Sequence, residues 1–248
     1  MDLPKCKLCL QDRKLVKSHI IPLSMFKNMY SEGSVVKVYS RNSPYPKKVP
    51  LGEYDRIICD SCEASFSGWD DYAHKLLLQE YKEKFFIKNS NGEKKAYRLV
   101  DVNYSLLKLF FMSLLWRVSV SERPIFSRVK IGGYREQLRK YISGSPNPDP
   151  RSQDEFSVIL TRYNDEIGSN IMMDPHQQRF GHVNFIQVNF AGYVAYIKVD
   201  KRRAPAPAPI NAFLLKPNGP LIVGLRSFIE SKEAQKAAEI LDSFPDWL

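Results

Sequence analysis

The sequence predicts a protein of the α+β class, and three observations lead to that prediction. Apolar residues recur at helical spacing over 104–120, which is typical of a buried helix. Segments rich in β-branched and aromatic residues occupy much of 156–199, which is typical of strands. Two C-x-x-C pairs precede both regions and indicate a metal-bearing N-terminal segment.

The composition is that of a globular chain. Of the 248 residues, 44% are hydrophobic and 26% are charged, which excludes a wholly disordered protein. The 12 glycines are too few for a collagen. A chain of this length forms one or two domains and buries a sizeable core.

The four cysteines form two pairs with the spacing of metal ligands. Cys6 and Cys9 make the first C-x-x-C, and Cys59 and Cys62 make the second. Zinc takes four thiolates in tetrahedral geometry, and each C-x-x-C turn offers two of them. The alternative is a redox dithiol, which would need only one pair. We therefore expect one structural Zn²⁺ bound by all four cysteines.

No segment of the sequence resembles a membrane span, which needs about 20 consecutive apolar residues. The N-terminus also lacks a basic region that leads into an apolar run, as a secretory signal would have. We therefore expect a cytoplasmic protein.

Charge is unevenly placed along the chain. The chain has 37 Lys and Arg against 27 Asp and Glu, and residues 1–50 alone carry a net charge of +7. Residues 53–71 reverse the sign, with six acids and only Arg56 as a base. A basic surface beside clustered carboxylates suits a metal-dependent phosphodiesterase that binds nucleic acid, although two solvated loops of opposite charge would give the same pattern.

Local signals predict the remaining elements. A helix is expected to start near Ser61 or Ser65 and to reach about Lys82. Asn91-Gly92 is a strong turn signal and predicts a hairpin over 84–100. The other expected elements are helices over 133–142 and 227–243, a loop over 144–152, strands over 156–163, 182–190 and 192–199, and a proline-rich extended segment over 201–210.

The order of motifs near the N-terminus resembles that of a known family. C-K-L-C is followed by S-H-I-I-P, which begins nine residues after Cys9, and then by I-C-D-S-C-E. This order is similar to the HNH nucleases of the His-Me finger family, in a zinc-bearing bacterial subgroup with S-H-I-I-P. The resemblance covers about residues 4–82. It implies a zinc-stabilised ββα-metal module in residues 1–82, followed by a mixed α+β region, residues 83–248, of unknown role.

The resemblance also implies the roles of individual residues. His19 takes the position of the general base, and Glu63 takes the position of a ligand to a catalytic divalent cation, Mg²⁺ or Mn²⁺. Asp70 lies seven residues beyond Glu63, two turns of one helix, so the two carboxylates are expected to share that cation. Asp55 and Asp71 are further carboxylates that could help to form the cation site. A neutral imidazole is the usual base near pH 7.

The sequence departs from the family pattern at three places, one of which is the missing middle Asn, where Tyr54 or Asp55 stands instead. Ser18 stands where the family has an acidic residue, and Glu63 stands for a final His or Asn. Our first hypothesis is an endonuclease that hydrolyses phosphodiester bonds in DNA or RNA. The alternative is a catalytically inactive zinc-stabilised protein that binds nucleic acid or another protein. The size of the region 83–248 indicates a further role there, such as binding a protein partner or forming an oligomer.

Overall fold

The computed structural model describes residues 3–29, 35–39, 45, 47–50, 52–79, 82, 85–144, 154–204, 210–242 and 244. Most of the expected loop over 144–152 and the centre of the proline-rich segment lie outside these residues. The predicted α+β class is confirmed, since helices and sheets both contribute to the core. None of the helices in the described part of the chain has the length and apolar character that crossing a bilayer requires.

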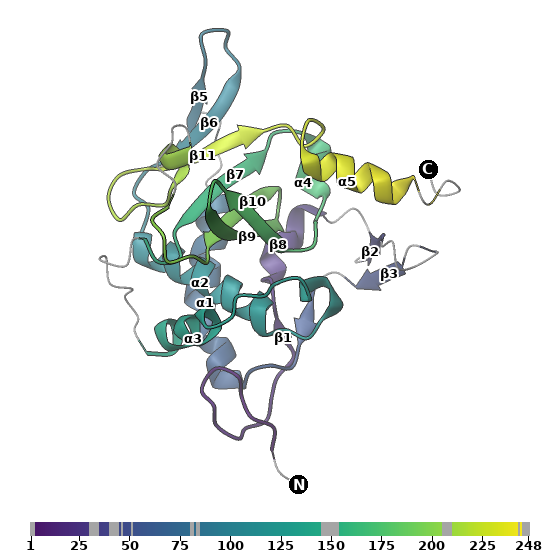
Figure 1. Ribbon diagram of the computed structural model, residues 1–248, viewed down its shortest axis with the longest axis vertical. Helices are drawn as coiled ribbons and strands as arrows, with labels where there is room; N and C mark the ends of the chain where they lie inside the picture. Colours follow the sequence, from purple (N-terminus) through teal and green to yellow (C-terminus); the bar gives the residue numbers. More distant parts are fainter. Residues whose placement is uncertain are drawn as a thin grey trace.

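The elements run in a mixed order along the chain (Figure 1). The helical elements are η1 (Leu23–Met29), α1 (Asp60–His74), the π-helical turn η2 (Lys75–Gln79), α2 (Tyr104–Val120), η4 (Pro124–Phe126), α3 (Tyr134–Gly144), α4 (Glu166–Asn170), η6 (Ile210–Phe213) and α5 (Lys232–Leu241). The strands are β1 (Ser18–His19), β2 (Val35–Val38), β3 (Lys47–Pro50), β4 (Tyr54–Asp55), β5 (Phe86–Lys88), β6 (Lys94–Leu99), β7 (Val158–Tyr163), β8 (His176–Phe180), β9 (Val183–Phe190), β10 (Tyr193–Lys198) and β11 (Leu221–Arg226).

A seven-stranded sheet forms the centre of the molecule, in the order β5-β6-β11-β7-β10-β9-β8. All its pairings are antiparallel except β11 with β7. β9 and β10 pair across Ala191-Gly192, as expected, and both of these residues have positive φ, as a tight two-residue hairpin turn requires. The hairpin predicted around Asn91-Gly92 is likewise present as β5 and β6.

The sheet is covered on both faces, which explains its nearly continuous apolar strands. In β10, Ala195 and Ile197 belong to the main core, on the side of α1, α2 and α3, whereas Val194 and Tyr196 belong to a second cluster beneath α5. α2 is buried on nearly all sides, and it follows the N-cap Asn103, whose side chain accepts a hydrogen bond from the Leu106 N–H at 3.1 Å. The main core also contains residues from both sides of position 82, so the cysteine-bearing segment packs directly on the rest of the chain.

Three sequence predictions need correction. β8 and β11 were not predicted. β8 has almost no apolar residues, whereas β11 does carry an apolar, β-branched run, Leu221 to Val223, that the sequence analysis overlooked. The last helix begins at Lys232 rather than near Ser227, since Ser231 is its N-cap and accepts a hydrogen bond from the Ala234 N–H at 3.1 Å. The helix expected to reach Lys82 ends as an α-helix at His74 and continues only as the π-helical turn.

Candidate functional site

The first C-x-x-C pair lies in a tight turn. The Leu10 N–H donates to the Cys6 carbonyl and the Cys6 N–H donates to the Gln11 carbonyl, both at 2.9 Å. Leu10 closes the turn in the left-handed region, with φ of 61°. This arrangement places Cys6 and Cys9 on one side of the turn.

The second pair lies at the beginning of α1. Cys59 is the N-cap residue, and Cys62 is in the first helical turn. Residues three apart on a helix share a face, so both thiols point towards the first pair. Backbone hydrogen bonds hold the two segments together: the Lys7 N–H donates to the Ile57 carbonyl and the Val16 N–H to the Ile58 carbonyl, both at 2.9 Å.

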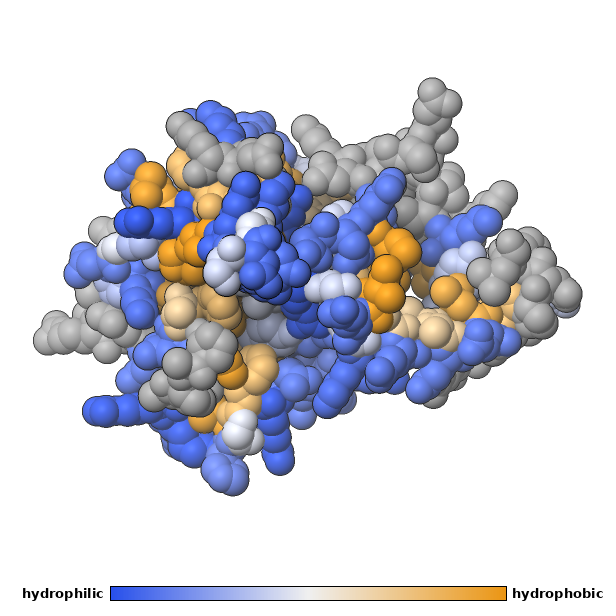
Figure 2. All heavy atoms as spheres, turned by 90° about the horizontal axis from the view of Figure 1, so that it is seen from above, coloured by the Kyte–Doolittle hydropathy of each residue, from blue (hydrophilic) through white to orange (hydrophobic). Residues whose placement is uncertain are grey.

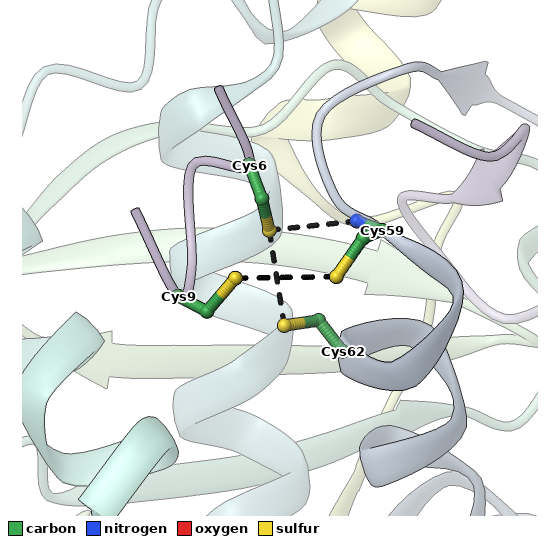
Figure 3. Close-up of side chains that lie close together, drawn as sticks. All are labelled: Cys6, Cys9, Cys59 and Cys62. Carbon is green, nitrogen blue, oxygen red and sulfur yellow. Dashed lines mark hydrogen bonds between the residues drawn. The ribbon is translucent and has the colours of Figure 1, made fainter. Parts of the chain in front are cut away.

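The four sulfurs converge on one point (Figure 3). All lie within 4.8 Å of one another; Cys6 Sγ is 3.7 Å from Cys62 Sγ, and Cys9 Sγ is 4.0 Å from Cys59 Sγ. Sulfurs bound to one tetrahedral zinc at about 2.3 Å would be roughly 3.8 Å apart. The four cysteines therefore form a group of the right size and chemistry to hold a metal ion.

The thiols respond to this crowding in opposite directions. Burial acts to raise the pKa of Cys59, but hydrogen bonds to Ser61 and Cys62 outweigh it and bring that pKa to about 6. Burial and the neighbouring sulfurs instead raise the pKa of Cys62 well above its ordinary range. Four adjacent thiols cannot all ionise without a cation to offset their charge, whereas a divalent ion would stabilise all four thiolates.

The cysteine turn is also tied to the helices behind it. Lys7 Nζ donates to the Val120 carbonyl at the end of α2 at 3.0 Å and pairs with Glu122 at 2.8 Å. Arg139 of α3 donates to the Leu8 carbonyl at 3.0 Å. The turn is thus part of the main body of the protein.

The S-H-I-I-P motif lies directly beside the start of α1. Ser18 and His19 form β1, which pairs with β4 in the register Ser18 to Asp55 and His19 to Tyr54. Ser18 is fully buried, and its Oγ donates a short hydrogen bond to the Glu63 carboxylate. The structure therefore brings Ser18 and Glu63 together, and these are two of the three positions at which the sequence departs from the HNH pattern.

His19 is half-buried against Tyr54, with 4.2 Å between the ring centroids. Its Nε2 is enclosed and has no hydrogen-bond partner among the described residues. Burial lowers the pKa of His19; the Glu63 carboxylate opposes this shift, while Arg117 and Lys17 add to it. The imidazole is therefore neutral at pH 7.

Asp70 lies farther along the same unbroken helix, but its carboxylate has a partner. Arg117 of α2 donates to both oxygens, at 2.7 and 2.9 Å, and also to the His19 carbonyl at 3.4 Å. The arginine side chain is only 1% exposed and the aspartate side chain 17%. A cation at Asp70 would have to compete with this buried guanidinium.

Arg117 is the residue of this site that the sequence analysis missed. It connects α1, α2 and β1, and its guanidinium also lies over the Phe66 ring, 5.0 Å from the centroid. The sequence did contain a signal for this residue: Arg117 is a single arginine in the otherwise apolar run at the end of α2. A buried arginine needs a partner of opposite charge, so an acidic partner could have been sought.

The other acids of the cluster do not converge with Glu63. Asp55 accepts hydrogen bonds from the Ser121 hydroxyl at 2.8 Å and the Glu122 N–H at 3.0 Å, so it anchors the chain after α2. Asp71 is exposed. Within the described residues, the four cysteines are the one group of three or more potential metal ligands that come together.

Comparison of the chain with protein-family models, with curated proteins and with solved structures finds no match in any of the three.

Proposed function

We propose that the four cysteines bind one structural Zn²⁺. The sulfur separations support this assignment, since 3.7 and 4.0 Å bracket the spacing of a tetrahedral zinc–thiolate site. The ion would fix the cysteine turn to the first turn of α1, and no open coordination position would remain for a substrate.

We further propose that the protein is a metal-dependent endonuclease of the HNH type, with residues 1–82 as its ββα-metal module. The observation that carries this proposal is the placement of His19, which is neutral at pH 7, on a strand beside the carboxylate at the start of α1. General-base catalysis needs a neutral imidazole, and phosphodiester hydrolysis needs a carboxylate for the cation nearby. The proposed substrate is DNA or RNA.

In the proposed reaction, His19 accepts a proton from the attacking water as the new P–O bond forms. The bond from phosphorus to the leaving oxygen breaks in the same displacement, and that oxygen takes a proton from solvent. A divalent cation, Mg²⁺ or Mn²⁺, supplies stabilisation of the negative charge that develops on the phosphate and the leaving oxygen. His19 performs only the proton transfer.

Glu63 is the proposed protein ligand to that cation. Mg²⁺ is commonly held by one or two carboxylates together with waters and substrate phosphates, so a single carboxylate suffices when the substrate completes the site. The Ser18 hydroxyl orients the carboxylate, and the N-terminal end of α1 favours its negative charge. Asp70 contributes by holding Arg117, which donates to the His19 carbonyl and so steadies β1.

A supercoiled-plasmid assay tests the enzymatic proposal. The zinc-loaded protein is incubated with Mg²⁺, with Mn²⁺, or with no added divalent cation. We expect conversion to nicked and linear forms only when Mg²⁺ or Mn²⁺ is present. The absence of any cleavage of DNA or of a matched RNA with either cation would contradict the proposal.

A second candidate is a zinc-stabilised binding protein without catalysis. Two observations favour it: Ser18 replaces the acid of the family motif, and His19 Nε2 is enclosed and out of reach of water in this arrangement. This candidate predicts salt-dependent nucleic-acid binding in the same preparation that fails to cut.

A further inference from the structure

The β5–β6 hairpin extends past the central sheet. β6 pairs with β11 only from Ala96 to Leu99, whereas its pairing with β5 continues to Lys88 opposite Lys94. Residues 88–95 therefore lie beyond the end of the sheet, and Figure 1 shows them as an arm that projects away from the body. We refer to residues 86–99 as the hairpin arm.

The tip of the hairpin arm is held rigidly by one side chain. Asn89 Oδ1 accepts hydrogen bonds from the Asn91 N–H at 3.0 Å and the Glu93 N–H at 2.9 Å, while Asn89 Nδ2 donates to the Glu93 carboxylate at 2.7 Å. Gly92, with φ of 79°, completes the turn. An arm that is already ordered loses little conformational entropy when it binds a partner.

The hairpin arm carries an excess of positive charge. It contains four basic residues and one acid, Glu93, which pairs with Lys95 at 3.0 Å. Lys88 and Lys94 lie directly opposite each other on the two strands. Lys94 lies over the Phe86 ring, 4.3 Å from its centroid, and Lys88 has no ion-pair or hydrogen-bond partner in the part of the chain that the structure describes.

The opposition of Lys88 and Lys94 is unfavourable for the isolated fold. Like charges at directly opposed positions of a sheet repel each other and destabilise the pairing. A polyanion placed against this face of the arm would convert that repulsion into attraction, since each lysine would then neutralise a negative group.

We propose that the hairpin arm binds double-stranded nucleic acid, with Lys88 and Lys94 against backbone phosphates. A two-stranded ribbon fits the major groove of DNA, and the turn residues Asn89, Ser90 and Asn91 are polar groups of the kind that contact phosphates and sugars. A lipid surface would favour an apolar tip instead. The end of the molecule that carries the arm shows mostly hydrophilic side chains, with apolar ones in separate patches (Figure 2).

This inference rests on the proposed function only in taking nucleic acid as the partner. The hairpin arm and β1 lie towards opposite ends of the molecule (Figure 1). The arm therefore adds affinity away from the bond that His19 would cleave, and its contribution is measured by binding alone.

The test compares two double variants with the same charge change. Lys88→Gln/Lys94→Gln removes the opposed pair of the arm, and Lys232→Gln/Lys236→Gln removes two exposed lysines of α5. Binding to a fluorescent duplex is measured by anisotropy between about 50 and 200 mM salt, without added divalent cation. We expect the salt slope of log affinity to fall by about two for the arm variant and to stay near the wild-type value for the α5 variant.

Thermal unfolding of the same proteins separates lost contacts from damaged folding. The arm variant should unfold at the wild-type temperature or above it, because the lysine repulsion is removed.

Equal losses of binding in both double variants, or no loss in the arm variant, would overturn the inference while leaving the nuclease proposal intact. Lysine-dependent binding to phosphatidylserine vesicles but not to the duplex would also overturn it. An arm effect on binding in a protein that never cuts would support the inference and reject the nuclease proposal.

Discussion

The two candidate sites at the start of α1 differ in how complete they are. The cysteine cluster takes all four ligands from the chain, and their sulfurs already have the spacing of one tetrahedral ion. The site around His19 has Glu63, oriented by Ser18, as its proposed cation ligand, while the nearby Asp70 carboxylate is paired with Arg117. Structural zinc sites are closed and catalytic sites keep positions open, so the difference is the one expected if the cysteines hold a structural ion and the His19 site takes the proposed catalytic cation.

A single helix start serves both sites. Cys62 and Glu63 are adjacent in the chain, and consecutive residues on a helix point in directions about 100° apart. One side chain therefore faces the cysteine turn and the other faces β1. We therefore expect the open site to depend on the closed one, because the position of Glu63 follows that of the helix start.

The largest effect is expected from breaking the closed site. Cys59→Ser should lower zinc content to less than about half an equivalent and unfold the cysteine-bearing segment, because structural zinc contributes roughly 10–16 kcal/mol of apparent binding energy to folding. Metal analysis and circular dichroism measure both changes. Full zinc content and a wild-type spectrum in this variant would show that the four cysteines do not act together.

Removal of the buried arginine should have the next largest effect. Arg117→Met leaves the Asp70 carboxylate without its partner, and breaking a buried ion pair costs about 3–5 kcal/mol. Urea unfolding of the zinc-loaded protein measures the change in the free energy of unfolding. The double variant Arg117→Met/Asp70→Asn should regain most of the loss, since no uncompensated charge remains. An equal loss in the single and double variants would assign the effect to packing instead.

A smaller effect, confined to the open site, is expected from Glu63→Gln. The variant should keep its zinc. It should need roughly tenfold or more Mg²⁺ for half-maximal cleavage, because even the loss of a residue that only supports a metal ligand lowers metal affinity by about tenfold or more. A magnesium titration of the initial rate measures it. Asp71→Asn, which alters an exposed carboxylate of the same helix, is the matched control and should leave the titration unchanged. An unchanged titration for Glu63→Gln would remove it from the cation site.

The pH dependence of cleavage should show the mildest effect. Burial lowers the pKa of His19 from its ordinary value of 6.5, so the imidazole stays neutral through pH 7 and becomes protonated only below 6.5. A base must be neutral to accept a proton, so the rate should be flat near neutrality and fall tenfold per pH unit below that lowered pKa. A midpoint of the acidic limb above pH 6.5 would contradict the role of this burial.

The sequence predicted the closed site better than the open one, for a physical reason. The spacing of the two ligands within each C-x-x-C is a local property of the sequence. Only one contact, between the two C-x-x-C segments, is then needed to bring Cys6, Cys9, Cys59 and Cys62 together. The partner of Asp70 could not be predicted in this way. Arg117 lies 47 residues away on α2, and only the packing of α1 on α2 brings the two together.

The strands of the fold likewise differ in how well the sequence predicts them. Strands over 156–163, 182–190 and 192–199 have strong local patterns, and β7, β9 and β10 occupy nearly the expected residues. β11, which lies between β6 and β7, has an apolar run, Leu221 to Val223, that the sequence analysis overlooked. β8 has little pattern of its own and is a strand because it pairs with β9 at the edge of the sheet. Tertiary context decides strand formation at such positions.

The most direct test of the central claim is the rate of plasmid cleavage by His19→Ala, measured with Mg²⁺ beside the wild type. The variant keeps all four cysteines, so its zinc content and its affinity for DNA measured without Mg²⁺ serve as internal controls. General-base catalysis contributes about 10²–10⁴-fold, and we expect a loss of that size with both controls unchanged. Cleavage by His19→Ala at the wild-type rate would contradict the assignment of His19 as the base.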